Sequence, residues 1–288
     1  MPSAHVTASE PKDAEPTTDP TAIIRAMLAE PDSKQAAALA AVEISAEEEQ
    51  QVGKRAAAAF VGYLASHQIR VIQRGRKVDQ LGKVVDKVRR CMTQAERYAR
   101  PTVYIVDSPR FDARVFPGGH LFFFRGLLES IGSEAALVGV IAHELSHLDR
   151  GHALQRLKRI KRIAETCRGE WKEMTQQQRL SARAAMAQIW EQPVELRSES
   201  QADLDAVRWT YQLGFDPLEM AGLVLKPRNA EVNQRLPGVS FSSSQGAREQ
   251  RHRAIFKEYE RLHKTSPKAE LKVGKELNIE YRTSNNER

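Results

Sequence analysis

The sequence predicts a mainly helical α+β domain with a small β-sheet. Apolar residues recur at helical spacing in several stretches between residues 45 and 263. Two short runs, 102–107 and 120–124, are rich in β-branched and aromatic residues, which is typical of strands. A third stretch, 133–151, is apolar on nearly every face up to residue 142, as in a helix at the core of a domain. We therefore expect the sheet to lie beside this buried helix.

The length and composition favour one domain with tails. A chain of 288 residues, 41% hydrophobic and 28% charged, can bury one sizeable core. We expect residues 45–265 to form the domain and residues 266–288 to form a C-terminal tail. Residues 1 to about 19 are rich in Pro, Thr, Ala and acid, which predicts disorder. We expect residues 1–44 to form a mostly disordered segment with a candidate short helix at 21–30.

Local signals mark the helices in this domain. Residues 45–48 (SAEE) have the capping-box pattern and predict a helix that runs to about Ser66. Apolar residues then repeat at helical spacing from residue 78 to residue 92, where we expect them to line the core. Ser133 is the expected N-cap of the buried helix, and Gly151 is its expected C-terminal stop. The buried helix should therefore end just after residue 147.

The buried helix contains the pattern His143-Glu144-Leu145-Ser146-His147. Two histidines four apart on a helix differ by about 40° in direction and roughly 6 Å in height, so both rings can reach one cation. Zinc suits such a pair, and Glu144 would lie beside the metal, where it can act as general base. The alternative is a surface helix with two unrelated histidines. The apolar surroundings argue against that alternative, because a buried histidine pair needs a partner.

A catalytic zinc takes three protein ligands, so a third ligand must lie elsewhere in the chain. A histidine six residues after His147 would complete one known arrangement, but Ala153 stands there and His152 is out of register. Glu199 is the better candidate, because it stands four residues before Asp203 in a second helical pattern. One of these carboxylates can bind zinc while the other orients a ligand histidine.

These residues resemble the M48 (Ste24/HtpX-like) zinc metallopeptidases, and especially their soluble envelope branch. The resemblance covers roughly residues 45–262. It implies a gluzincin-type domain with one Zn²⁺ per chain, bound by His143, His147 and Glu199, with Asp203 orienting a ligand. The matching segments are 107–109 (DSP), 116–119 (FPGG), 125–128 (RGLL), 133–135 (SEA), 143–147 (HELSH), 199–203 (ESQAD) and 214–217 (GFDP).

The chain departs from the family pattern at three places. Residues 112–114 read Asp-Ala-Arg where the family usually has Asn-Ala-Phe. Gln201 stands where the family often has a second glutamate, and no predicted role falls on it. The family's C-terminal His-Pro element is represented only by residues 242–246 (SSSQG). We therefore expect the fourth position on the metal to hold water.

The sequence thus predicts a zinc-dependent metalloendopeptidase that hydrolyses peptide bonds by metal-activated water, with Glu144 as general base. We expect its substrates to be unfolded or misfolded protein segments. One alternative is a zinc-holding chaperone or adaptor without turnover, against which the intact glutamate argues. The other alternative is a basic module that binds a membrane or nucleic acid, with the metal site incidental to its function.

Two further predictions concern substrate and transition state. The strand at 120–124 is the candidate edge that pairs with extended substrate backbone, and the alternative is a core strand. Arg251 and His252 are candidate stabilisers of the transition state, since a cationic or donor side chain near the metal can hold the oxyanion. The alternative for both is ordinary surface charge.

Charge and the lack of long apolar runs bear on partners and location. The net charge of +7 is spread over several segments without interleaved aromatics, so nucleic-acid binding is not favoured. The basic stretch 153–163 is a candidate for peripheral contact with an anionic membrane, and a solvated helix face is the alternative.

No apolar run fits a signal peptide or a membrane span, which predicts a cytoplasmic protein. The family resemblance favours the cell envelope or periplasm instead. Cys91 and Cys167 are expected to be isolated thiols, with one disulfide between them as the alternative.

Overall fold

Four short strands form one mixed sheet in the order β1-β2-β4-β3. They are β1 (Val71–Ile72), β2 (Thr102–Val106), β3 (Ala113–Phe116) and β4 (His120–Phe124). β4 pairs in parallel with β2 and antiparallel with β3, while β1 pairs antiparallel with β2. The computed structural model describes residues 38–166, 174–180, 196–226, 245–268 and 270–274.

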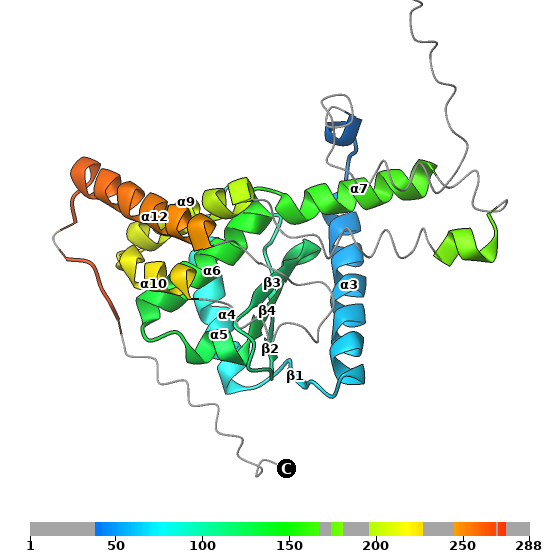
Figure 1. Ribbon diagram of the computed structural model, residues 1–288, viewed down its shortest axis with the longest axis horizontal. Coiled ribbons are helices and arrows are strands. Elements are labelled where there is room, and N and C mark those ends of the chain that lie inside the picture. The colour runs from blue at the N-terminus through cyan, green and yellow to red at the C-terminus, as the bar shows by residue number, and fades with distance from the viewer. Residues whose placement is uncertain (1–37, 167–173, 181–195, 227–244, 269, 275–288) are drawn as a thin grey trace, which may run out of the picture.

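Helices make up most of the rest of the described chain (Figure 1). They are α3 (Ala46–Ser66), α4 (Arg76–Arg89), α5 (Arg125–Glu129), α6 (Glu134–Asp149), α7 (His152–Thr166), α9 (Leu196–Gln212), α10 (Ala221–Leu225) and α12 (Gln245–Thr265), with 3₁₀ turns η1 (Pro117–Gly119) and η2 (Pro217–Met220). The sequence prediction of a mainly helical α+β fold with a small sheet beside the buried helix is confirmed.

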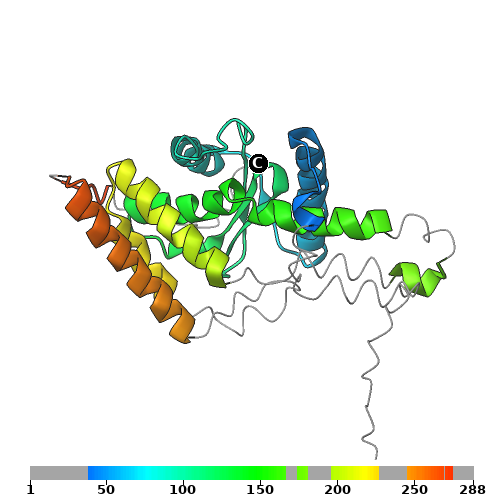
Figure 2. The ribbon, with the colours of Figure 1, turned by 90° about the horizontal axis from the view of Figure 1, so that it is seen from above.

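The sheet separates two apolar clusters because alternate residues of a strand point to opposite faces. Ile105 and Phe123 face the larger cluster, which α4, α6 and α9 fill. Tyr104 and Phe122 face the smaller cluster, which α3 covers. Figure 1 and Figure 2 show α3 on one side of the sheet and α6, α9 and α12 on the other. The buried helix α6 therefore lies in the middle of a layered structure.

The predicted edge strand at 120–124 is wrong, because β4 pairs with β2 on one side and β3 on the other. The edge on that side is β3, which includes one of the residues that depart from the family pattern, Arg114. The sequence did not mark β3 as a strand because its four residues include a charged one and lack the run of apolar residues seen in β4. The Pro-Gly-Gly turn joins β3 to β4, with Gly118 and Gly119 at φ of 72° and 82°.

Helix α3 is attached to this turn by close backbone contact and one buried carboxylate. A Cβ atom on Gly53 would lie 1.9 Å from the Pro117 carbonyl oxygen, so only glycine allows the approach. Glu49 accepts hydrogen bonds from Arg97 Nε at 2.6 Å, from the Tyr98 hydroxyl at 2.9 Å and from Gly118 N at 3.2 Å. These contacts fix the β3–β4 turn against the helix.

The last described residues of the chain return to the start of α6. Residues 270–274, which the sequence assigned to a C-terminal tail, return to the start of α6, where Ala135 N donates to the Val273 carbonyl at 3.1 Å. Lys272 also forms a β-bridge with Phe215.

Within the residues that the structure describes, none of the helices combines the length and the apolar character needed to cross a membrane. Cys91 is a free, half-buried thiol, and Cys167 lies outside the described residues.

The contact between Gly53 and Pro117 gives a prediction for stability. Gly53→Ala should lower the free energy of unfolding by about 1 to 3 kcal/mol, because the added methyl group overlaps a backbone oxygen. Gly62→Ala is the matched control in the same helix, where a Cβ meets nothing within 4 Å. The control should be neutral or stabilising by up to about 1 kcal/mol through helix propensity. Urea unfolding curves measure both changes, and equal effects in the two variants would contradict the close contact.

Candidate metal centre

Helices α6 and α9 lie side by side and carry the residues predicted to bind metal. The Ser133 side chain accepts a hydrogen bond from Ala136 N at 3.1 Å and so caps α6. α6 is buried on several faces, which fixes its rotation about its own axis. The helix ends at Asp149, and Gly151 separates it from α7 with a φ of 71°. His152 can therefore begin α7 close to the last turn of α6.

The structure brings His143, His147 and Glu199 together. The two Nε2 atoms of the histidines lie 3.2 Å apart. Glu199 Oε2 lies 3.6 Å from His143 Nε2, and Glu199 Oε1 lies 3.4 Å from His147 Nε2. Ligand atoms around a tetrahedral zinc ion with bonds of 2.0 to 2.1 Å are about 3.3 Å apart. The two Nε2 atoms are thus spaced like two corners of such a tetrahedron, and each faces one oxygen of the Glu199 carboxylate at a similar distance.

The environment of Glu199 also fits a metal ligand. Its carboxylate is buried, and neither oxygen accepts a well-aligned hydrogen bond within the described residues, although Arg251 Nη1 lies 2.9 Å from Oε2. Burial opposes ionisation, but the two histidines outweigh it and hold the pKa of Glu199 well below its usual range. A buried, ionised carboxylate with unused lone pairs is suited to bind a cation.

Asp203 and Arg251 fix the orientation of His143. Asp203 Oδ1 lies 3.0 Å from His143 Nδ1, which leaves Nε2 to face the other ligands. Arg251 binds both oxygens of Asp203, with its Nε at 2.6 Å and its Nη2 at 2.8 Å. Burial alone would lower the pKa of His143, but hydrogen bonds and charge from Asp203 and Glu199 raise it to about 10. Without a cation, a proton on His143 is therefore favoured.

His147 is oriented by His152, which the sequence excluded as a third metal ligand. Its Nδ1 lies 2.8 Å from Nδ1 of His152, and the side chain of Gln201 hydrogen-bonds His152 in turn. Burial, together with the nearby His147, lowers the pKa of His152 to about 4, so His152 is neutral and can accept the His147 Nδ1 proton. This contact leaves His147 Nε2 to face His143 and Glu199. The only sequence signal for this pair was the helix stop at Gly151, directly before His152.

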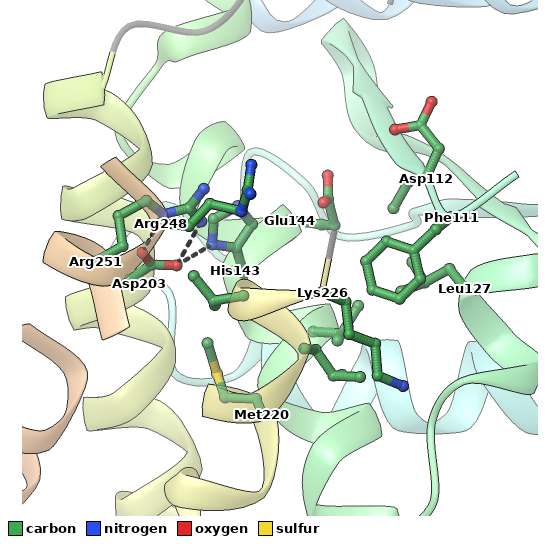
Figure 3. A pocket seen from close by; sticks show the side chains of 14 residues that line it. Phe111, Asp112, Leu127, His143, Glu144, Asp203, Met220, Lys226, Arg248 and Arg251 are labelled. Atoms are coloured by element: carbon green, nitrogen blue, oxygen red, sulfur yellow. Dashed lines mark hydrogen bonds and ion pairs between the residues drawn. The ribbon is translucent and has the colours of Figure 1, made fainter. Parts of the chain in front are cut away.

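Glu144 lies beside the three ligands and not among them. It lines a pocket that also contains His143, Asp203 and Arg251 (Figure 3). Burial raises the pKa of the Glu144 carboxyl, while the two ligand histidines act in the opposite direction. This is the position that the sequence predicted for a general base.

The two candidate transition-state stabilisers lie in different surroundings. Arg251 is buried and lines the pocket, where it contacts Asp203 and Glu199. His252 follows it on α12, is half-buried and packs against Phe256, with ring centroids 4.8 Å apart and ring planes tilted by 44°. His252 is not among the residues that line the pocket. Arg248, one turn before Arg251, does line it.

The sequence also predicted that water holds the fourth position on the metal. Residues 242–244, on which this prediction rests, lie outside the described residues, so it stays a prediction.

Part of the basic helix α7 contacts the chain itself. Lys158 Nζ donates to the Ala40 carbonyl at 3.2 Å. Lys161 Nζ donates to the Glu43 carbonyl at 2.9 Å and to the Glu48 carboxylate at 3.0 Å. These two lysines therefore hold the segment that precedes α3. Contact of residues 153–163 with an anionic membrane stays a prediction.

The role of His152 can be tested through metal affinity. His152→Ala should weaken Zn²⁺ binding by about 10- to 100-fold, because it removes the acceptor that fixes the ring of a ligand histidine. His152→Asn should retain more affinity, since its amide oxygen can accept the same hydrogen bond. His263→Ala replaces an exposed histidine on α12 and should change nothing. Competition with a chromophoric chelator measures the affinities, and wild-type affinity in His152→Ala would rule out the orienting role.

Comparison with known proteins agrees with this geometry. The family model for Peptidase family M48 matches residues 79–273, which is more than half of the chain. The chain is 37% identical over 75 residues to the mitochondrial metalloendopeptidase OMA1 of Danio rerio, covering 24% of this chain and 16% of that protein. It is 37% identical over 54 residues to OMA1 of Homo sapiens, covering 19% of this chain and 10% of that protein. These matches thus span less than a fifth of the relatives' length. On the extent of the family match, the chain belongs to peptidase family M48.

Proposed function

We propose that this chain is a zinc-dependent metalloendopeptidase. The observation that carries the proposal is the convergence of three side chains, with Glu144 beside them. His143 Nε2 and His147 Nε2 lie 3.2 Å apart, and they lie 3.6 Å and 3.4 Å, respectively, from the two oxygens of Glu199. Two imidazoles and one carboxylate are a donor set that suits catalytic zinc. Membership of a peptidase family and the name metalloendopeptidase of the OMA1 relatives support hydrolysis of peptide bonds within proteins.

Different residues of the chain bind the metal and transfer protons. A bound zinc ion supplies Lewis acidity, which makes water a nucleophile near neutral pH and polarises a carbonyl group. Glu144 accepts the proton of the attacking water at its carboxylate and later donates it to the nitrogen of the leaving amine. Asp203 keeps the ring of His143, and His152 keeps the ring of His147, in the orientation that binds the metal. Arg251 keeps Asp203 ionised in its buried position.

Within the described residues, the side of β3 that faces away from β4 pairs with no other strand, and this edge is the proposed docking site for substrate backbone. Phe124 N donates to the Asp112 carbonyl at 3.1 Å, so Asp112 and every second residue after it bond to β4. The backbone groups of Ala113 and Val115 therefore face away from β4. Asp112 and Ala113 also line the pocket that holds Glu144. An extended peptide added to this edge would run past the metal centre.

An edge of this kind recognises backbone more than side chains. Folded proteins keep most backbone donors and acceptors within their own helices and sheets. We therefore propose that the substrates are unfolded or misfolded protein segments. Direct contact of the whole protein with a membrane or with nucleic acid is not needed for this function.

The roles of Glu144 and Glu199 can be separated by two substitutions. Glu144→Gln should keep one zinc per chain but lower casein cleavage at least about 100-fold, because it removes only the general base. Glu199→Ala should lose both zinc and cleavage, because two protein ligands remain. Zinc content and casein cleavage are measured together, with and without chelator. Wild-type cleavage by Glu144→Gln would refute the mechanism, and a zinc-loaded wild type without turnover would favour a chaperone or adaptor.

The edge strand can be tested by removing one outward N–H group. Val115→Pro removes the donor that faces the free edge without breaking a bond to β4, so kcat/KM for an unfolded peptide should fall about 2- to 10-fold. Val115→Ala is the matched control, because it shortens the side chain but keeps the N–H group. Zinc content should be the same in both variants. If the two variants cleave the peptide equally well, the substrate does not use this edge.

A further inference from the structure

Helix α12 contributes two arginines to the wall of the pocket that contains Glu144. Arg248 and Arg251 both line this pocket, together with His143. Three residues advance an α-helix by about 4.5 Å and nearly complete a turn, so the two side chains leave the same side of α12. In Figure 3 this wall lies across the pocket from Phe111, with Glu144 between the two sides. Two guanidinium groups therefore border the place where the general base acts.

The carboxylates of α9 use all three nitrogen atoms of the Arg251 guanidinium. Nε and Nη2 lie 2.6 Å and 2.8 Å from the two oxygens of Asp203, and Nη1 lies 2.9 Å from Glu199 Oε2. Arg251 is buried, so turning it toward a substrate would leave a buried carboxylate without its positive partner, which is costly. Arg251 is thus a positioning residue for Asp203 and Glu199.

Arg248 differs from Arg251 in its surroundings. It stands one turn nearer the start of α12 and is only half-buried. Its guanidinium group stays protonated throughout the pH range of folded proteins and carries five N–H donors. A partly exposed side chain on a helix changes rotamer rapidly, so it can adjust to a substrate that enters the pocket. Arg248 therefore brings a permanent positive charge to the pocket without being built into the support of the metal ligands.

The proposed docking edge determines which way a substrate carbonyl group points. Successive carbonyl groups of an extended strand point to opposite sides in the plane of the sheet. The substrate groups that pair with Ala113 and Val115 face β3, so the carbonyl groups between them point away from it. The scissile carbonyl group must be of the second kind, because pairing with β3 would turn it away from the metal ligands. It therefore points across the pocket, toward the side that holds His143 and Arg248.

Hydrolysis places a negative charge on this carbonyl oxygen. As the water oxygen bonds to the carbonyl carbon, the π electron pair of the C=O bond moves to the carbonyl oxygen, and one proton of the water moves to Glu144. The C=O bond then re-forms, and the nitrogen leaves with the electron pair of the C–N bond and takes the proton from Glu144. A donor that meets the oxygen mainly while it is charged accelerates the reaction by a factor of about 100 to 1000.

We propose that Arg248 is a catalytic residue that donates hydrogen bonds to the scissile carbonyl oxygen as this oxygen becomes negatively charged. The inference rests on the proposed function, because it concerns the same reaction. It replaces the two candidates that the sequence indicated. Arg251 is held by Asp203 and Glu199, and His252 is not among the residues that line the pocket.

The rate test uses zinc-loaded protein and a peptide that spans a bond cut by the wild type in casein. Arg248→Ala should lower kcat about 100-fold and change KM by less than about 3-fold, because the lost interaction forms mainly in the transition state. Arg248→Lys keeps the charge but not the fork of donors, so its kcat should exceed that of Arg248→Ala by at least about 5-fold. Arg253→Ala is the matched control, since it removes an exposed arginine of α12 and should leave kcat unchanged.

Zinc affinity distinguishes a catalytic role from a structural one. Arg248→Ala should bind zinc as tightly as the wild type does. Arg251→Ala should bind zinc about 10- to 100-fold more weakly, because Asp203 loses the partner that holds it against His143. Weaker zinc binding by Arg248→Ala would show that Arg248 supports the metal ligands and would overturn the catalytic assignment.

A binding measurement compares the charged and uncharged forms of the reacting group. In a phosphonamidate analogue of the same peptide, a negatively charged tetrahedral phosphorus group replaces the scissile carbonyl group. Zinc-loaded Glu144→Gln protein, with and without Arg248→Ala, is titrated by calorimetry with the analogue and with the parent peptide. Arg248→Ala should weaken binding of the analogue at least about 30-fold and that of the parent peptide less than about 3-fold. Equal effects on the two ligands, or no effect on either, would overturn the inference.

The outcomes for the two proposals can be told apart. If Arg248→Ala cleaves the peptide at the wild-type rate, Arg248 takes no part in the reaction, and the peptidase function still stands. If the zinc-loaded wild type cleaves no bond in casein, the peptidase function fails, and the catalytic role of Arg248 fails with it.

Discussion

The metal centre depends on two carboxylates that stay ionised inside the protein. Glu199 and Asp203 stand one turn apart on α9, and both are buried. A buried carboxylate is strongly unfavourable unless a positive group or several donors compensate it. Asp203 receives that compensation from Arg251 and from the ring of His143. Glu199 shares Arg251 and otherwise faces two imidazoles, so a cation at that point completes the balance of charge.

This balance of charge requires that α6 and α9 keep fixed positions relative to each other. The packing around α6 fixes its position. Met220 reaches the backbone of α6 only because residue 139 is glycine. On the sheet side, a Cβ on Gly126 would lie 2.1 Å from the Pro109 carbonyl oxygen, so α5 is closely attached to the loop before β3. These contacts hold α6, which carries the candidate ligand histidines, and the loop before β3, which leads to the proposed substrate edge. The candidate metal centre and the proposed docking edge therefore depend on the same packed elements.

Local signals in the sequence were enough for much of this arrangement. The capping residues Ser45 and Ser133 predicted two helix starts that the structure contains, because a cap acts within a single turn. The spacing of His143 and His147 was likewise a property of one helix. The rest depended on contacts between segments far apart in the chain. Nothing near residue 113 shows that β3 is an edge, and nothing near residue 152 shows that its ring meets His147. Arg251 stands 48 residues after Asp203, so their pairing needed the packed α9 and α12.

The return of residues 270–274 to the start of α6 bears on the order in which the protein can form during synthesis. The hydrogen bond from Ala135 to the Val273 carbonyl joins the first turn of the ligand-bearing helix to a segment made more than a hundred residues later. α12, which supplies Arg251 to Asp203, is also made late. A ribosome-bound chain that stops after α6 holds both histidines but none of the partners that orient His143. The nascent chain therefore cannot assemble this site early, so the complete candidate metal centre forms only when nearly the whole domain has left the ribosome.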